Sequence, residues 1–174
     1  MKIRKRFRFG AAVAIVCCGI LCGPVSQATA IDVALYGEPP ILDPVIFTSD
    51  SATIITHHIF ETLYTFNSKW EVRPVLASAL PTITENGTVV TIPLRTDAVF
   101  HNGKTMTAED AAAAVSRWTR VSPRGKLVGA MATSVTVKDP RTIEIRLKQP
   151  FAPLLPLLAS NTAAAVVMPK ELNA

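Results

Sequence analysis

The stretch FHNGKTMTAEDAAAAVSRW, residues 100–118, joins a sharp turn to the start of a helix. The His-Asn-Gly tripeptide at 101–103 suits a tight turn, because Asn and Gly tolerate positive φ angles. Thr107 and Asp110 have the T-x-x-D spacing of a capping box, and acidic residues in a first turn favour the helix macrodipole. We therefore predict a helix over residues 108–120. Helical spacing places four residues on its buried face: Ala111, Ala114, Val115 and Trp118.

Alternating apolar residues on both sides of this stretch predict β-hairpins. Before it, the Asn-Gly pair at 86–87 separates two β-branched runs, which is typical of a hairpin turn. Pro93 cannot donate a backbone hydrogen bond, so its strand is predicted to be an edge strand or to carry a bulge. After it, SVTVKDPRTIEIRLKQP (134–150) alternates apolar and polar residues around an Asp-Pro-Arg turn. The predicted fold class is α/β (mixed α+β), with β-hairpins packed against helices.

A second helix is predicted nearer the N-terminus, from residue 51 to 64. Apolar residues recur there at helical spacing, and the Ser-Asp-Ser segment at 49–51 supplies the N-cap. His57 and His58 would lie on this helix with side chains about 100° apart, so they cannot readily bind one metal ion. Both are therefore predicted to be surface or boundary residues without a metal.

Shorter elements are predicted elsewhere. IDVALYGEPPILDP (31–44) begins with a short strand that ends at a rigid loop. Residues 67–81 suggest a turn, a short segment and a one-turn helix, with Trp70 half-buried. PFAPLLPLLASN (150–161) predicts a short helix, and AAAVVMP (163–169) predicts a buried strand that ends at its proline.

The first thirty residues have the order of a secretory signal peptide. Basic residues at positions 2–8 precede the apolar run FGAAVAIVCCGILCG, and Ala28-Thr29-Ala30 fits the A-x-A cleavage rule. The apolar run is shorter than the roughly 20 residues that a spanning helix needs. We predict a signal peptide over residues 1–30, cleaved after Ala30, and a mature chain over 31–174.

Charge and cysteine content exclude several classes of function. The net charge of +5 comes from the leader, because the remaining 13 basic residues equal the 13 acidic ones. A neutral mature chain without basic clusters predicts no nucleic-acid partner. All three cysteines also lie in the leader, which excludes disulfides, thiolate catalysis and cysteine-ligated zinc from the mature chain.

None of those cysteines follows the small residue that precedes a lipidated cysteine in lipoprotein signals. Cys17 follows Val16, Cys18 follows another cysteine, and Cys22 follows a leucine. The expected product is therefore periplasmic and not a lipoprotein.

Six stretches, taken in order, resemble the N-terminal part of the family 5 solute-binding proteins, the peptide- and nickel-type receptors of ABC importers. They are EPPILDP (38–44), HHIFETLYTF (57–66), VRPVLASAL (72–80), TVVTIPLRTDAVFHNGKTMTAEDA (88–111), VKDPRTIEIRLKQPFAPLLPLLA (137–159) and MPKEL (168–172). The family signature is a strand ending in L-R, then F-H-[DN]-G, then T-A-[DE]-D at a helix start. Pro93 departs from the usual strand residue before L-R.

The resemblance implies a lobe of the type II periplasmic-binding-protein fold, incomplete because family members are several times longer and have two lobes. It implies capture without chemistry: no enzyme activity, no cofactor, and a monomer that delivers a peptide or related small solute to an ABC permease at the inner membrane. Nickel, haem, oligosaccharides and opines remain open as solutes. A truncated first lobe is expected to be unable to bind alone.

Thr48, Ser49 and Asp50 are the substrate-binding residues that this resemblance favours, because they follow LDP and would face the cleft. The alternative is that the polar residues at 49–51 only cap the following helix.

Two other functional classes remain open. A small exported hydrolase would need a nucleophile elbow, a zinc motif or a paired-carboxylate site. Residues 31–174 contain no G-x-S-x-G, no H-E-x-x-H and no Cys, and the pair Glu109-Asp110 is better explained as a helix start. His101 as a general base would lack a nucleophile and an orienting acid nearby. A stand-alone structural or interaction lobe would instead be soluble and monomeric, would unfold cooperatively, and would bind no hydrophobic dye.

Overall fold

The computed structural model describes residues 30–173, and the chain divides into two compact units, Met1–Ala34 and Leu35–Ala174. Within the first unit, the described residues 30–34 form neither helix nor strand, so the predicted short strand is absent there. The predicted signal peptide lies outside the described residues, except for Ala30, which is exposed.

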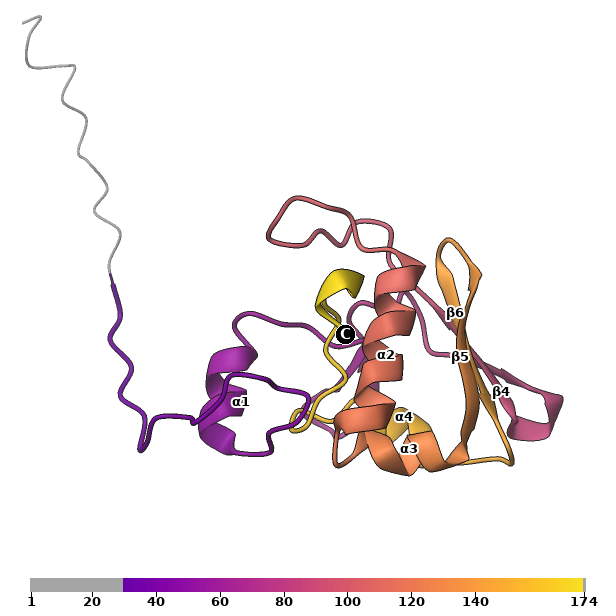
Figure 1. The fold of residues 1–174 in the computed structure, drawn as a ribbon, viewed down its shortest axis with the longest axis horizontal. Helices are drawn as coiled ribbons and strands as arrows, with labels where there is room; N and C mark the ends of the chain where they lie inside the picture. The colour runs from indigo at the N-terminus through magenta and orange to yellow at the C-terminus, as the bar shows by residue number, and fades with distance from the viewer. Residues whose placement is uncertain (1–29, 174) are drawn as a thin grey trace, which may run out of the picture. The chain divides into compact units, whose positions relative to one another are not determined.

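The second unit contains a four-stranded antiparallel sheet, whose strands β4, β5 and β6 are labelled in Figure 1. Its strands are β3 (Thr82–Thr84), β4 (Val89–Pro93), β5 (Ala132–Asp139) and β6 (Thr142–Leu147), in the order β3-β4-β6-β5. Both predicted hairpins are confirmed: the short 3-10 turn η1 (Glu85–Gly87) connects β3 to β4, and Pro140-Arg141 connects β5 to β6. The positive φ angles of Asn86 and Gly87 account for the Asn-Gly signal.

The prediction for Pro93 was wrong, because β4 is an inner strand. β3 pairs only with residues 89–91, so Pro93 lies beyond the end of β3, where its missing N–H leaves no ladder bond unmade. Its carbonyl accepts a hydrogen bond from the Ser78 N–H at 2.9 Å. The register shifts of this sheet lie in β5 rather than in β4.

Helix α2 (Ala108–Val121) lies along one face of the sheet, as Figure 1 shows. The capping box is confirmed: the Asp110 N–H donates to Thr107 Oγ1 at 3.3 Å, and the Thr107 N–H donates to the Asp110 carboxylate at 2.8 Å. The four residues predicted for the buried face of α2 are all at most 2% exposed. They pack in the same core as Ile143 and Ile145 of β6, where the small alanines allow helix and sheet to approach closely.

The C-terminal end of α2 is fixed by two unusual contacts. Trp118 is fully buried, and its Nε1–H donates to the carbonyl of Ala163 at 2.7 Å. The Ser122 hydroxyl donates to the same carbonyl at 3.0 Å. Helix α3 (Gly125–Met131) then turns back so closely that a Cβ atom on Gly125 would lie 2.0 Å from the Trp118 carbonyl oxygen. This corner therefore requires glycine.

The predicted helix over residues 51–64 was wrong in its second half. Helix α1 (Asp50–Thr56) ends after seven residues, and the chain continues into strand β1 (Tyr64–Phe66), which pairs with β2 (Val72–Pro74). Strand pairing buries Leu63 and Tyr64 completely, whereas the helical face had also included Ile59, which is 44% exposed. Long-range pairing thus overrides the local helical pattern.

Two other predictions for this region were also wrong. No helix forms within residues 67–81, where the chain makes a turn, strand β2 and a series of bends. Trp70 is 81% exposed rather than half-buried, because it has a φ angle of 60° in the tight turn between β1 and β2. Its ring centroid lies 5.8 Å from that of Phe66.

Residues 154–172 form the C-terminal part of the unit. Helix α4 (Leu154–Leu158) is confirmed as predicted, and residues 163–167 are buried. They form one isolated β-bridge, from Val166 to Thr62, instead of the predicted strand, before the 3-10 turn η2 (Lys170–Leu172). Within the described residues, no helix has the length and apolar character needed to cross a membrane.

The loop before α1 is held by the C-terminal part and by α2. The N–H groups of Ala163 and Ala164 donate to the carbonyls of Phe47 and Pro44, at 3.3 and 2.9 Å. Arg117 donates to the Asp43 carboxylate at 2.6 Å, in an ion pair that is mostly buried. Burial acts to raise the pKa of Asp43, but hydrogen bonds from Arg117 and the backbone, with the charge of Arg117, lower it below its ordinary value.

Candidate functional site

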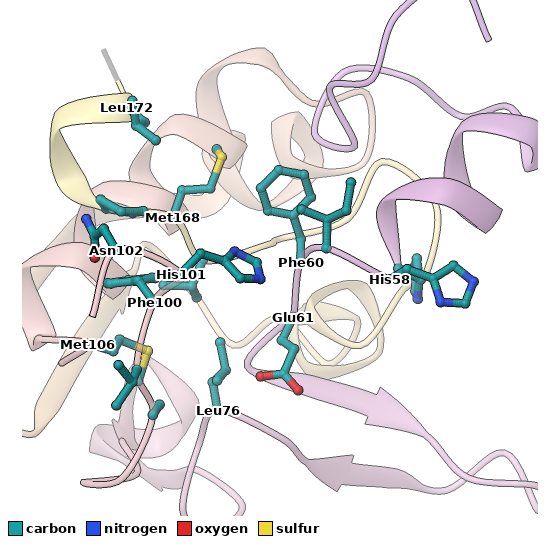
Figure 2. A pocket seen from close by; sticks show the side chains of 16 residues that line it. His58, Phe60, Glu61, Leu76, Phe100, His101, Asn102, Met106, Met168 and Leu172 are labelled. Carbon is teal, nitrogen blue, oxygen red and sulfur yellow. The ribbon is translucent and has the colours of Figure 1, made fainter. Parts of the chain in front are cut away.

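An open pocket of about 500 Å³ lies among the described residues (Figure 2). Three segments form it: residues 57–61 after α1, residues 98–102 before α2, and residues 167–172 at the end of the described chain. Leu76 and Met106 complete its lining. We call it the Phe60–Phe100 pocket, after the two phenylalanines among its lining residues.

The turn at 100–103 forms one wall of the pocket, so the prediction of a tight turn there is confirmed. The Gly103 N–H donates to the Phe100 carbonyl at 2.8 Å, and Gly103 has a φ of 81°. The Phe100 N–H donates to the Lys104 carbonyl at 2.9 Å, which closes the loop. The loop places His101 and Asn102 in exposed positions on the pocket rim.

Asp110 connects this wall to the end of the chain. Besides its capping bonds, its Oδ1 accepts a hydrogen bond from the Lys170 N–H at 2.8 Å, and its side chain is buried. Lys104 pairs with Glu171 at 3.3 Å. The backbone N–H of Glu171 and the hydrogen bond from Lys104 lower the pKa of this carboxylate. The T-x-x-D motif therefore positions the η2 wall as well as the helix start.

The third wall is held by backbone contacts to the same C-terminal segment. The Val167 N–H donates to the Glu61 carbonyl at 2.9 Å. The His57 Nε2 lies 2.9 Å from the Asn161 carbonyl, so this imidazole is used as a hydrogen-bond donor within the fold. His58 is exposed and lines the pocket. Both histidines are exposed and line the pocket, but they follow α1 rather than lying on it as predicted.

The chemistry of the pocket is mainly apolar. Its buried floor contains Leu76, Met106 and Val167, and its half-buried walls include Phe60, Phe100 and Met168. Five polar side chains line the pocket: His57, His58, Glu61, His101 and Asn102. The last four are labelled in Figure 2. Among residues 30–173, no group of three His, Cys, Asp or Glu side chains is placed to hold a metal ion. This arrangement supports apolar contact with a few hydrogen bonds at the rim.

The predicted substrate-binding residues lie elsewhere. Thr48, Ser49 and Asp50 do not line the Phe60–Phe100 pocket, and Thr48 and Asp50 are exposed at the start of α1. Ser49 occupies the N-cap position but makes no capping bond with its side chain; its hydroxyl lies 2.7 Å from that of Ser51. The assignment of these three residues to a solute site remains a prediction.

The pocket residues themselves were missed by sequence reasoning, which assigned 100–103 and Asp110 to scaffolding only. Nothing in the local pattern links Asp110 to Lys170, because the two lie sixty residues apart. The available signal was composition: aromatic and Met residues recur in the three segments that the fold brings together.

A family model described as bacterial extracellular solute-binding proteins, family 5 middle, matches residues 71–173, which is more than half of the chain. The chain belongs to family 5 of these proteins. The matched region contains the four-stranded sheet, α2 and two of the three pocket walls. It does not include Thr48, Ser49 and Asp50.

Curated family 5 relatives are similar over most of this chain but are much longer. A probable peptide ABC transporter periplasmic-binding protein of Sinorhizobium fredii is 29% identical over 119 residues, which cover 68% of this chain and 22% of the relative. The glutathione-binding protein GsiB of Salmonella paratyphi A is 29% identical over 156 residues, which cover 86% of this chain and 29% of GsiB. The chain thus spans less than a third of these two relatives.

Solved structures of binding proteins confirm the predicted type II periplasmic-binding-protein lobe. NikA from Brucella suis, in complex with Fe(III)-EDTA, matches with a TM-score of 0.65 at 25% identity, covering 74% of this chain and 26% of NikA. The oligopeptide-binding protein AppA from Bacillus subtilis, in complex with a nonapeptide, matches with a TM-score of 0.68 at 23% identity. That match covers 78% of this chain and 27% of AppA, and it supports the fold alone.

Proposed function

We propose that this chain is the N-terminal part of the substrate-binding component of an ABC importer. In this proposal, residues 31–174 contribute to the first of two lobes, which close around a peptide or a related small solute. The receptor then delivers its solute to the permease subunits at the inner membrane. Family 5 membership over residues 71–173 is the single observation that carries the proposal.

Two further observations support capture without chemistry. The relatives include proteins named for peptide and glutathione binding. The described residues of the pocket offer apolar surface and rim hydrogen bonds, which suit binding of a neutral or mixed solute. Thr48, Ser49 and Asp50 are proposed as the polar groups of this lobe that face the solute.

The proposed location is the periplasm, after export and cleavage behind Ala30, without a lipid anchor, as a monomer. The order of basic residues, apolar run and A-x-A site supports this. N-terminal sequencing of the exported protein tests it: a mature start at Ile31 is expected. A product that retains residues 1–30 would contradict the proposal.

Solute binding is tested with a chimera, because the chain spans less than a third of its relatives. In Salmonella GsiB, the matched segment is replaced by residues 31–174, and the chimera is screened by thermal shift against glutathione, oligopeptides, opines and nickel complexes. At least one of these solutes is expected to raise the melting temperature in a saturable way. The 174-residue chain alone is expected to show no such shift.

A control protein and a variant chimera accompany this screen. Unmodified GsiB with glutathione shows that the screen detects a known solute, and a chimera carrying Thr48→Ala, Ser49→Ala and Asp50→Ala tests the predicted contacts. This variant should bind the identified solute at least about tenfold more weakly, because each lost polar contact is worth about 1 kcal/mol. Tight one-to-one binding by the chain alone would contradict the proposal that the lobe needs a second half.

A further inference from the structure

Basic residues are concentrated in one segment of the second unit. Residues 111–138 contain five basic side chains and no acidic one, so the nearest acidic residues along the chain are Asp110 and Asp139. The five are Arg117, Arg120, Arg124, Lys126 and Lys138. The neutral net charge of residues 31–174 therefore conceals a basic segment.

Two of these five cations are paired within the fold, and three are not. Arg117 pairs with Asp43 at 2.6 Å, and the Lys138 Nζ lies 3.8 Å from the Glu144 carboxylate. The other three are exposed, and none of them forms an ion pair with a described residue: Arg120, Arg124 and Lys126. Three positive charges therefore face the solvent without a carboxylate partner among the described residues.

These three residues surround the corner where α2 ends and α3 begins, at the lower end of α2 in Figure 1. The corner is rigid, because α3 packs so closely on α2 that a Cβ atom on Gly129 would lie 2.5 Å from the Thr119 carbonyl oxygen. Lys148 adds a fourth exposed cation, whose Nζ donates to the Ala130 carbonyl near the end of α3 at 2.9 Å. We call Arg120, Arg124, Lys126 and Lys148 the basic corner.

Two apolar side chains are exposed among these cations. Val121 is 37% exposed and Leu127 is 56% exposed. Neither lines the Phe60–Phe100 pocket, and neither lines a smaller apolar cavity of about 200 Å³ between β3 and α4. The corner therefore offers an apolar surface surrounded by positive charge, outside both cavities.

Helix stability does not account for this arrangement. Arg120 lies in the last turn of α2, where a cation is favourable to the macrodipole. Arg124 and Lys126 lie at the start of α3, where a cation is unfavourable, and the first turn of α3 contains no acidic residue. These two charges are better explained by an anionic partner than by the helix that carries them.

An anionic lipid surface matches both features of the corner. Its phosphate groups attract Lys and Arg side chains, and the hydrocarbon beneath them accepts exposed apolar side chains. Inorganic phosphate or a purely acidic peptide would meet the cations but would leave Val121 and Leu127 in water. The combination of charge and apolar surface therefore favours lipid.

We infer that the basic corner docks the protein on an anionic phospholipid surface. Arg120, Arg124 and Lys126 meet the headgroup phosphates, Lys148 lies at the edge of the contact, and Val121 and Leu127 enter the boundary between headgroups and acyl chains. The 14 residues of α2 place the corner about 20 Å from the capped end of this helix, next to which residues 98–102 line the pocket. The inference goes beyond the proposed function and requires no bound solute.

Co-sedimentation with vesicles tests this inference. The leader has its own basic and apolar residues, so the test uses residues 31–174, which contain the whole second unit and its core. Cooperative unfolding followed by circular dichroism verifies that each preparation is folded. At low ionic strength, half of the protein is expected to sediment at about 1 mM lipid with equimolar phosphatidylglycerol and phosphatidylcholine.

The lipid charge and the salt concentration are the first controls. Pure phosphatidylcholine vesicles should bind at least about tenfold more weakly, and about 0.5 M salt should release the protein from the anionic vesicles. Equal sedimentation with the two kinds of vesicle overturns the inference.

Charge reversal locates the contact. The triple variant Arg120→Glu, Arg124→Glu, Lys126→Glu is expected to weaken binding to the anionic vesicles at least about tenfold. A matched control reverses three exposed cations outside the corner and has the same net charge: Lys69→Glu, Lys104→Glu, Lys170→Glu. Equal affinities of the two triple variants overturn the inference, because binding would then follow net charge alone.

The apolar side chains distinguish lipid from an acidic polypeptide. Val121→Ser, Leu127→Ser keeps every charge and should weaken binding to the anionic vesicles about tenfold, because less apolar surface enters the lipid. Poly-glutamate is the competing probe, and it should displace the wild type from the vesicles only weakly. An unchanged affinity of the double serine variant, together with tight binding of the wild type to poly-glutamate, overturns the lipid surface in favour of an acidic polypeptide.

Discussion

Helices α1 and α2 both begin after a hydroxyl residue, but they differ in capping and in length. Thr107 starts α2 with a reciprocal capping box, and the helix continues for 14 residues. Ser49 starts α1 in the same backbone conformation, but its side chain caps no amide, and the helix ends after seven residues. Both helices have a hydroxyl residue at the N-cap and an acidic residue in the first turn, so these features alone do not determine the length of the helix.

The difference lies in what each helix packs against. α2 buries Trp118, Val115 and a row of alanines on the sheet, and its cap aspartate also accepts the Lys170 N–H. The buried residues of α1 are only Ser51, Ala52 and Thr56, which offer little apolar surface. Most helical stability in proteins comes from packing of an apolar face, so α1 ends where a strand offers more burial.

The largest expected effect is the loss of the buried indole at the end of α2. Trp118→Ala should reduce the free energy of unfolding by about 3–5 kcal/mol, because it removes a fully buried ring and leaves the Ala163 carbonyl with one donor fewer. Denaturant unfolding of the full chain, followed by circular dichroism, measures it. Trp70→Ala is the control, and because Trp70 is 81% exposed its effect should stay within about 0.5 kcal/mol. Similar losses at the two positions would break the comparison.

Removal of the cap aspartate should have the next largest effect. Asp110→Ala should cost about 2–3 kcal/mol, since it deletes the reciprocal cap and the bond to the Lys170 N–H together. The matched change in α1, Asp50→Ala, removes an exposed acidic residue and should cost less than about 0.5 kcal/mol. Hydrogen exchange at the Lys170 amide gives a second readout, and it should become faster only in the α2 variant.

The smallest effect concerns pH and the loop that precedes α1. The pKa of Asp43 in the folded chain lies below its ordinary value of 3.8, so its ion pair with Arg117 stabilises the fold at neutral pH. That contribution is lost as the pH falls through the lowered pKa. Asp43→Asn should therefore be about 1 kcal/mol less stable than the wild type at pH 6, and the difference should shrink below about pH 4. If the difference in the free energy of unfolding between wild type and Asp43→Asn were the same at every pH in this range, the Asp43–Arg117 ion pair would not be what stabilises the loop.

The central part of the fold could be predicted from sequence because its signals are local. Residues 100–118 contain their own turn, cap and buried face, and the hairpin of β5 and β6 contains its own alternation. The end of helix α1 could not be predicted, because the non-helical structure of residues 57–64 depends on pairing with β2 and on contact with Val166. The exposure of Trp70 was also missed, because the sequence gives no sign that this aromatic residue has a positive φ in a tight turn.

The pocket was less predictable than the fold. Its walls come from three segments whose hydrogen bonds cross long stretches of chain, such as Glu61 to Val167 and Asp110 to Lys170. Family resemblance pointed to Thr48, Ser49 and Asp50 instead, through their position after LDP. Sequence spacing alone carries no information about which distant segments meet, so the pocket had to come from the structure.

The contacts of Ala163 have a consequence for the order in which the protein acquires its shape during synthesis. A ribosome delivers residues 44–47 more than a hundred positions before their partners at 163 and 164 leave the exit tunnel. The hairpins and α2 have nearby partners and can close while translation continues, whereas the early loop must wait. A pause before residues 163 and 164 have left the exit tunnel would therefore delay this closure and prolong the exposure of the loop to proteases.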